Sequence, residues 1–260
     1  MDKKRIVEVN NLGMTYHTFN GETEAIKDID FHVYEGEIVS IVGPSGCGKS
    51  TLLSIIAGLI APSKGEVLVN NNKVVKPSKD IGYMFQRDHL FEWRTILQNV
   101  LIGLEIHGKL DEKSIQTAEE LLEAYGLADF KNNYPRQLSG GMRQRAALIR
   151  TLITEPNLLL LDEPFSALDY QTRLAIADEI GIILKQEKKT ALMVTHDIAE
   201  AISLSDRIII LTNRPAKIKD IIEIDLNCPE GIWSPLRCRE APEFRHYFNR
   251  IWKELDIHVK

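Results

Sequence analysis

The sequence has few cysteines, no long apolar run and no strong excess of charge, and each shortage excludes a class of protein. Its 260 residues include three cysteines with no CxxC spacing, which excludes a disulfide framework or a zinc knuckle. Its apolar runs, of which residues 52–61 form one of the longest, fall short of the roughly 18–20 residues that cross a bilayer. The start, MDKKRIVEVNN, lacks an apolar core, so no signal peptide is expected.

The charge balance is mildly acidic, with 32 basic and 37 acidic residues and a net charge of −5. That balance argues against a protein that wraps nucleic acid. Hydrophobic residues make up 44%, which excludes intrinsic disorder and suits one or two folded domains. We expect a reducing cytoplasm, where Cys228 and Cys238 have the option of pairing but are predicted to be free thiols.

Short apolar runs alternate with helical patterns, which is typical of an α/β sheet fold. The runs at 38–42 and 158–161 are apolar at nearly every position, as strands buried on both faces of a parallel sheet are. Helical spacing places a set of apolar residues on one face, before an expected stop at Gly126: Ile115, Ala118, Leu121, Leu122 and Tyr125. The predicted strands are 6–9, 29–33, 38–42, 65–69, 81–85, 158–161, 191–194, 208–211 and 218–224.

Strand patterns stop between about Arg87 and Glu155, so this stretch is predicted to be a helical subdomain inserted into the α/β core. After residue 226, prolines and a glycine mark a turn-rich passage. A last helix is predicted over about 242–255. One stripe of it is expected to pack on the protein's own core, and its members are Phe244, Tyr247, Phe248, Ile251 and Trp252.

Residues 43–51 read GPSGCGKST and satisfy the phosphate-loop pattern G-x-x-x-x-G-K-[ST], between a predicted strand and a helical run. Glycines let backbone N–H groups crowd around phosphate oxygens, and the helix N-terminus adds partial positive charge. Lys49 supplies a full charge to the phosphates and Ser50 a hydroxyl to Mg²⁺. The nucleotide-binding loop is therefore predicted to comprise Gly43, Pro44, Ser45, Gly46, Cys47, Gly48, Lys49, Ser50 and Thr51.

Two further patterns point to the same chemistry. The apolar strand LLLL ends in Asp162 and Glu163, and buried acids at the end of a strand are costly unless paired or bound to metal. Asp162 suits a Mg²⁺ partner, and Glu163 suits polarising a water. In LSGGM, Ser139 is placed to cap the helix that follows, which makes a second helix N-terminus for anions; an ordinary capped helix is the alternative.

In type, order and spacing these motifs resemble those of the ATP-binding-cassette (ABC) ATPases over about residues 5–225. The resemblance implies an α/β fold, a P-loop NTPase (RecA-like) core with an antiparallel β edge and the inserted helical subdomain at about 87–155. It divides the chain into an ABC ATPase domain at 1–225 and a short helical tail at 226–260. LSGGM is similar to the family signature, but Met142 stands where that signature usually has Gln.

The resemblance implies that the chain binds ATP and Mg²⁺ and hydrolyses ATP. Tyr16 resembles the aromatic residue that stacks on adenine. Ser50, Gln86 and Asp162 match the family's residues near Mg²⁺. Glu163, His196 and Gln86 match its catalytic residues. Residues that act across a head-to-tail dimer of two such chains are matched by Ser139, Gly140, Gly141, Met142 and Asp169.

Within the family, the chain resembles the ATPase subunits of bacterial importers for nitrate, sulfonates such as taurine and related small solutes. Residues 85–100, SGGMRQR and RPAKI at 214–218 carry this likeness. It implies membrane permease subunits as partners, an indirect link to a solute-binding protein, and a peripheral position on the cytoplasmic face of the bacterial inner membrane. Trp93 lies where the permease docks in that group, with local packing as the alternative.

A different class shares every nucleotide motif: soluble ABC ATPases that act on nucleic acid or ribosomes. Their marks are a second cassette, a coiled-coil insert or a strongly basic face, and none is evident here. We therefore expect no nucleic-acid partner. A module that only binds nucleotide is disfavoured because Glu163 and His196 are both present.

Overall fold

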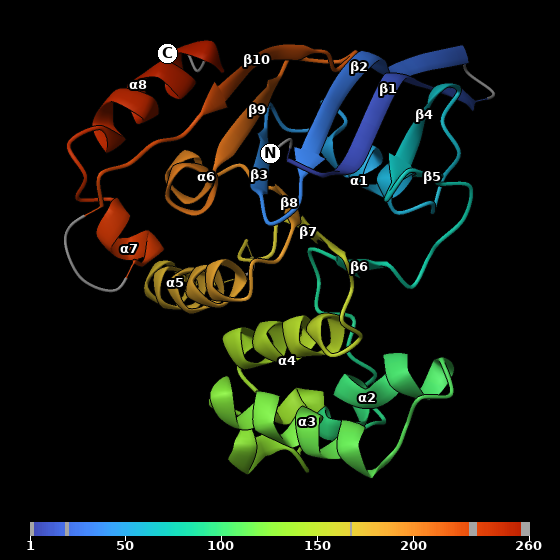
Figure 1. Ribbon diagram of the computed structural model, residues 1–260, viewed down its shortest axis with the longest axis vertical. Helices are drawn as coiled ribbons and strands as arrows, with labels where there is room; N and C mark the ends of the chain where they lie inside the picture. The colour runs from blue at the N-terminus through green and yellow to red at the C-terminus, as the bar shows by residue number, and fades with distance from the viewer. Residues whose placement is uncertain (1–2, 19–20, 167, 229–232, 256–260) are drawn as a thin grey trace.

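The computed structural model describes residues 3–18, 21–166, 168–228 and 233–255 and is organised around two β-sheets (Figure 1). The first sheet is antiparallel, in the order β2 (Gly21–Tyr34), β1 (Arg5–Thr18), β4 (Lys64–Val69) and β5 (Asn72–Lys73). The second has the order β10 (Ile218–Glu223), β9 (Arg207–Leu211), β3 (Ile38–Val42), β8 (Ala191–Val194), β7 (Leu158–Asp162) and β6 (Ile81–Met84). All its pairs are parallel except β10 with β9.

The four inner strands of the six-stranded sheet are buried on both faces, as their uninterrupted apolar runs predict. Every residue of β3, β7, β8 and β9 is buried. Successive side chains of β7 alternate between two cores. Leu158 and Leu160 join the core that lies toward the antiparallel sheet and α1 (Lys49–Ile56), whereas Leu159 and Leu161 join the core shared with the helices on the other face.

Three helices form a group below the sheets in Figure 1: α2 (Ile96–Ile106), α3 (Glu112–Ala124) and α4 (Gly140–Leu152). Two single-turn 3₁₀ segments, Ala128–Phe130 and Pro135–Gln137, lie between α3 and α4. The α3 prediction is confirmed: Asp111 caps its start, and Gly126 follows it with φ of 67°. The subdomain and tail boundaries stay predictions, because one continuous core joins these helices to the sheet.

The remaining helices cover the sheet near its C-terminal strands. They are α5 (Tyr170–Gln186), α6 (Ile198–Leu204), α7 (Pro235–Cys238) and α8 (Phe244–Glu254). The predicted packing of the α8 stripe is confirmed, because Ile251 is fully buried and Phe244, Tyr247 and Phe248 pack against the core formed with α6, β9 and β10. Trp252, at the edge of the stripe, is 38% exposed. None of the helices in the described residues has the length and apolar character to span a bilayer.

The prediction of free thiols at Cys228 and Cys238 is wrong, because the two form a disulfide with their Cα atoms 4.5 Å apart. The spacing of ten residues gives no motif, so the sequence does not signal the pairing. The chain brings them together by folding α7 back against α5, where Leu236 N–H donates to the Asp178 carboxylate at 2.7 Å. Cys47 stays free and buried.

The strand predictions are confirmed in place, and those at 38–42 and 191–194 have the predicted bounds. β1 and β2 are much longer than predicted, at 14 residues each. Their pairing contains several register shifts, which interrupt the apolar alternation that marks a strand in sequence. The two-residue β5 was not predicted, because both its residues are exposed and polar.

We expect Gly65→Ala to destabilise the fold far more than Gly108→Ala. Both glycines have positive φ, +78° and +65°, which costs a side chain about 1–2 kcal/mol. A Cβ at Gly65 would also overlap the carbonyl oxygens of Asn10 and Asn11, adding about 1–3 kcal/mol, whereas Gly108 faces open space. Urea unfolding of both variants measures the difference, and equal losses would contradict the close β1–β4 approach.

Candidate functional site

The phosphate loop connects β3 to α1 and is shaped by glycines that adopt backbone angles unfavourable to other residues. Gly46 and Gly48 have φ of 71° and 129°, and a Cβ on Gly48 would lie 3.0 Å from the Ala25 carbonyl oxygen. Lys49 is 6% exposed, and its ammonium donates to the carbonyl oxygens of Gly43 and Pro44 at 2.8 and 3.0 Å. A single cation is thereby fixed at the centre of a loop whose N–H groups suit an anion.

Asp162 lies beside the loop, at the end of β7, which β8 separates from β3 in the sheet. Its carboxylate accepts hydrogen bonds from the Ser50 hydroxyl at 3.1 Å and from the Tyr83 hydroxyl at 3.3 Å. Burial raises the pKa of Asp162 above its usual value, although these hydrogen bonds favour the ionised form. A hydroxyl and a carboxylate oxygen side by side are the ligands that Mg²⁺ prefers, with phosphate oxygens and water as the rest. In the described residues no cluster of three or more His, Cys, Asp or Glu side chains forms a separate metal site.

Three predicted catalytic residues converge on one oxygen. Gln86 donates from Nε2 to Glu163 Oε2 at 3.0 Å, and His196 Nδ1 lies 3.2 Å from the same oxygen. They come from the ends of β6, β7 and β8, which are neighbours in the sheet. Glu163 has a left-handed backbone with φ of 46°, a costly conformation for this residue type and one found at functional sites.

A cavity of 280 Å³ joins Glu163 and the phosphate loop to Tyr16 on β1. Gln86 and His196 contact Glu163 from outside the lining of this cavity. The Tyr16 hydroxyl lies 3.3 Å from Thr51 Oγ1, and the residue is 39% exposed at the rim of the cavity. Cys47 does not line the cavity; its side chain is 2% exposed and packs inside the loop. The described residues that line the cavity are Tyr16, Ala25, Ser45, Gly46, Gly48, Lys49, Ser50, Thr51, Glu163 and Arg214.

The LSGGM residues and Asp169 lie outside this cavity. Ser139 caps α4 by accepting from Met142 N–H at 3.3 Å, and Asp169 caps α5 by accepting from Thr172 N–H at 3.1 Å. Gly140 is the first residue of α4, and Met142 packs against the helical core, so its side chain contributes to packing. Asp169 ends the sequence SALD at 166–169, and Ala167 of this sequence lies outside the described residues.

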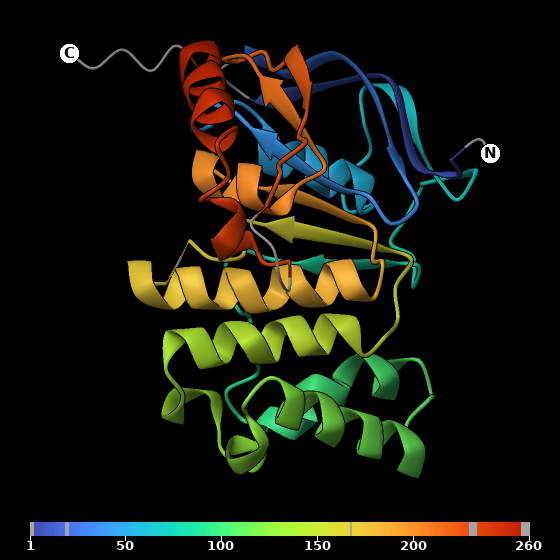
Figure 2. The same cartoon turned by 60° about the vertical axis from the view of Figure 1, so that its left-hand side comes forward.

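The second glycine of LSGGM, Gly141, lies at a point where a larger side chain does not fit. Figure 2 shows α4 and α5 running side by side. A Cβ at Gly141 would lie 2.8 Å from Thr172 Cγ2 and 3.0 Å from Ile176 Cδ1, both on α5. The glycine therefore permits close packing of the two helices, in addition to any role toward an anion.

Charged residues that the sequence analysis missed lie behind His196. Asp197 caps α6 by accepting from Glu200 N–H at 3.0 Å, and its other carboxylate oxygen lies 3.7 Å from Arg173 of α5. Glu200 is 3% exposed, and its Oε1 lacks a hydrogen-bond partner in the part of the chain described here. Burial raises the pKa of Glu200 to about 8, with Asp197 adding repulsion. The sequence DIAE at 197–200, where α6 begins, gives no sign that Glu200 is buried.

Tyr83 and Arg214 were also missed as site residues. Tyr83 reads as an ordinary aromatic strand residue, yet its hydroxyl reaches Asp162. Arg214 stands in a turn far along the sequence, and its Nη2 donates to the Gly46 carbonyl oxygen at 2.7 Å. Only the sheet order, which places β9 beside β3, brings this turn to the phosphate loop.

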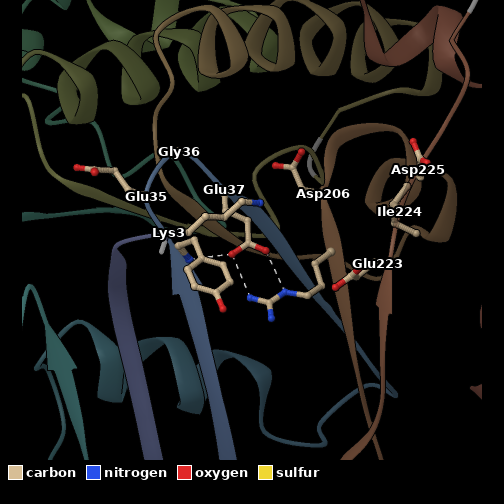
Figure 3. Close-up of a pocket in the computed structure, with 10 residues that line it drawn as sticks. Lys3, Glu35, Gly36, Glu37, Asp206, Glu223, Ile224 and Asp225 are labelled. Atoms are coloured by element: carbon tan, nitrogen blue, oxygen red, sulfur yellow. Dashed lines mark hydrogen bonds and ion pairs between the residues drawn. The ribbon is translucent and has the colours of Figure 1, made fainter. Parts of the chain in front are cut away.

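A second, larger cavity of 520 Å³ lies at the amino ends of the parallel strands (Figure 3). Acidic side chains dominate it, among them Glu35, Glu37, Asp206 and Glu223. Glu37 forms a two-pronged ion pair with Arg207 at 2.9 and 3.0 Å, drawn as dashed lines in Figure 3. Ligands of open α/β sheets bind at the opposite, carboxyl ends, so this cavity is not the candidate site.

The fold and the site together define a P-loop NTPase: a largely parallel sheet, a phosphate loop that follows β3 and a carboxylate pair at the end of β7. The ABC transporter family model matches residues 26–166. Over 250 residues the chain is 48% identical to the uncharacterized ABC transporter ATP-binding protein YtlC of Bacillus subtilis, a match that covers 96% of this chain and 95% of that one. The chain belongs to the ABC transporter family and is an ATPase.

Two further comparisons agree. The aliphatic sulfonates import ATP-binding protein SsuB of Bacillus thuringiensis is 38% identical, over 92% of this chain and 96% of that protein. The dimeric structure of a post-hydrolysis state of the ATP-binding cassette MJ0796, bound to ADP and Pi, matches with a TM-score of 0.74 and 34% identity. That match covers 85% of this chain and 99% of the other. The predicted P-loop fold and the likeness to the sulfonate importer group are thereby confirmed.

We expect Glu200→Gln to stabilise the protein increasingly as pH rises. A carboxyl group whose pKa is raised from 4.5 to about 8 keeps its proton in the folded state while the unfolded chain loses it, so wild-type stability falls between these two values. The glutamine variant lacks this titration. Urea unfolding across pH 5 to about 9 should show its advantage growing and then levelling above about pH 8. A constant difference at every pH would contradict the assignment.

Proposed function

We propose that this chain is the ATP-hydrolysing subunit of an importer, working with a second copy of itself and with separate membrane permease subunits. The observation that carries the proposal is the meeting of Gln86 and His196 on one oxygen of Glu163, beside a complete phosphate loop. A protein that only binds nucleotide needs the loop but has no need of a carboxylate held between an amide and an imidazole.

ATP binding uses the cavity from Tyr16 to Glu163. Tyr16 stacks on the adenine, and Lys49 and the loop N–H groups hold the phosphates. Ser50 and Asp162, with Gln86, hold Mg²⁺, which offsets phosphate charge when bound. Glu163 orients and polarises the attacking water; Gln86 and His196 fix its carboxylate, and His196 also faces the γ-phosphate.

The dimer proposal rests on residues that one chain leaves outside its own nucleotide cavity. Ser139, Gly140, Gly141, Met142 and Asp169 do not line it, although they carry a helix N-terminus suited to anions. In a head-to-tail pair, the N-terminus of α4 from one copy closes on the nucleotide of the other. The MJ0796 cassette, whose structure is similar to this chain, is dimeric in that structure, which supports this arrangement.

The transport proposal draws on the relatives named for aliphatic sulfonate import. The solute is then nitrate, a sulfonate such as taurine or a related organic compound, delivered by a solute-binding protein to the permease. The chain sits at the cytoplasmic face of the bacterial cell membrane. Trp93 is 72% exposed beside Phe91, with ring centroids 4.9 Å apart, and offers an apolar surface for the permease near Gln86.

We expect Glu163→Gln to bind ATP with near wild-type affinity and to hydrolyse it roughly 10²-fold more slowly, the scale of a lost general base. The amide keeps the volume of the carboxylate but cannot polarise water. Phosphate release and fluorescent-nucleotide binding measure the two effects. Glu155→Gln, an acid-to-amide change outside the cavity, is the control. Normal turnover in Glu163→Gln would contradict the role of Glu163 in polarising the attacking water.

We expect Trp93→Ala to reduce recovery of the chain with its membrane permease in detergent pull-downs by at least about tenfold, because an exposed aromatic anchor carries much of such an interface. Trp252→Ala, a partly exposed tryptophan on α8, is the matched control and should leave recovery unchanged. Equal recovery of both variants would contradict docking at Trp93. Recovery of ribosomes or nucleic acid in place of a permease would favour the soluble alternative.

A further inference from the structure

We propose that Arg214 is a phosphate-binding residue of the nucleotide site and supplies its second cation beside Lys49. The inference rests on the proposed use of this cavity for ATP. It adds a residue from the turn between β9 and β10, a segment that lies far from the phosphate loop in sequence. Its guanidinium would contact the phosphates at the Gly46 side of the loop.

The turn is fixed to β2 beside the phosphate loop. Ala216 N–H donates to the Ala25 carbonyl oxygen at 2.9 Å, and Lys27 N–H donates to the Ala216 carbonyl oxygen at 3.0 Å. A Cβ on Gly48 would lie 3.6 Å from Ala216 Cβ. The segment 212–216 is thus fixed between β2 and the loop, with Ala216 buried in the core and Arg214 lining the nucleotide cavity.

The turn is also held internally. The Thr212 hydroxyl donates to the carbonyl oxygens of Asn213 and Pro215 at 3.0 and 3.2 Å, and it accepts from Lys217 N–H at 3.0 Å. Thr212 N–H donates to the Lys217 carbonyl oxygen at 2.9 Å. The backbone of a residue carried by such a closed turn is preorganised, so little backbone entropy is lost when that residue binds a ligand.

The guanidinium of Arg214 is held in position by a hydrogen bond, but its positive charge is not balanced by an ion pair in the part of the chain that the structure describes. Its Nη2 donates to the Gly46 carbonyl oxygen at 2.7 Å, which anchors one corner of the group. Arg214 is exposed, lines the same cavity as Lys49, and makes no ion pair with an acidic side chain in the described residues. A guanidinium has five N–H donors in a planar fork, so the anchored group keeps donors for a second acceptor.

The charges of the cavity favour a phosphate as that acceptor. Glu163, the acidic lining residue, is engaged by Gln86 and His196, while Lys49 already donates to two loop carbonyl oxygens. A polyphosphate brings more negative charge than one ammonium balances. Arginine binds phosphate through paired N–H groups, and Gly46 lies in the part of the loop that cradles the α- and β-phosphates. Arg214 therefore recognises ATP and ADP alike.

The test compares Arg214→Gln, Arg214→Lys and Arg245→Gln. The last removes the same charge from an exposed site on α8 outside the cavity and is the matched control. Affinities for Mg-ATP and Mg-ADP are measured by calorimetry at low and high salt, with thermal melting as the check on folding. We expect Arg214→Gln to weaken both nucleotides by about tenfold and to flatten the salt dependence. Arg214→Lys should restore part of the affinity and the full salt dependence, and Arg245→Gln should match wild type.

Two results would overturn the inference. The first is nucleotide affinity within twofold of wild type in Arg214→Gln. The second is weakened binding with an unchanged salt dependence, which would reduce Arg214 to a structural latch on Gly46. Failure of the wild-type chain to bind ATP is a separate result, and it would overturn the proposed function itself.

Discussion

The site depends on one constraint: the strands β3, β8, β7 and β6 run parallel, so their carboxyl ends meet at one edge of the sheet. The phosphate loop, His196, the Asp162–Glu163 pair and Gln86 each lie at or just after the end of one of these strands. Hydrophobic burial on both faces holds the order of the strands. The catalytic geometry is therefore fixed by the core of the protein and owes little to the loops themselves.

The same constraint explains what the sequence could predict. A motif that follows its own strand, such as GPSGCGKS after residues 38–42, shows both chemistry and location, and so the phosphate loop and the acid pair were found. The fold class follows from the alternation of apolar runs with helical patterns. Each of these signals lies within a short stretch of sequence, so it can be recognised without the structure.

What the sequence did not predict depends on contacts between distant segments. Arg214 reaches Gly46 because β9 pairs with β3, and Tyr83 reaches Asp162 because β6 pairs with β7. Glu200 is buried by helices that come from other parts of the chain, and α7 brings Cys238 to Cys228. None of these residues carries a local pattern, since burial and pairing are properties of the folded arrangement.

The packing at Gly141 has a mechanical consequence. Because only a hydrogen atom separates α4 from α5 at this point, the N-termini of the two helices, which bear Ser139 and Asp169, belong to one stiff block. A movement of α4 toward α5 at this contact would push α5 as well, because no space separates them. In the proposed dimer, each copy would then bring Ser139 and Asp169 to the partner's nucleotide in a single movement. The two sites would close together, because neither residue could approach without the other.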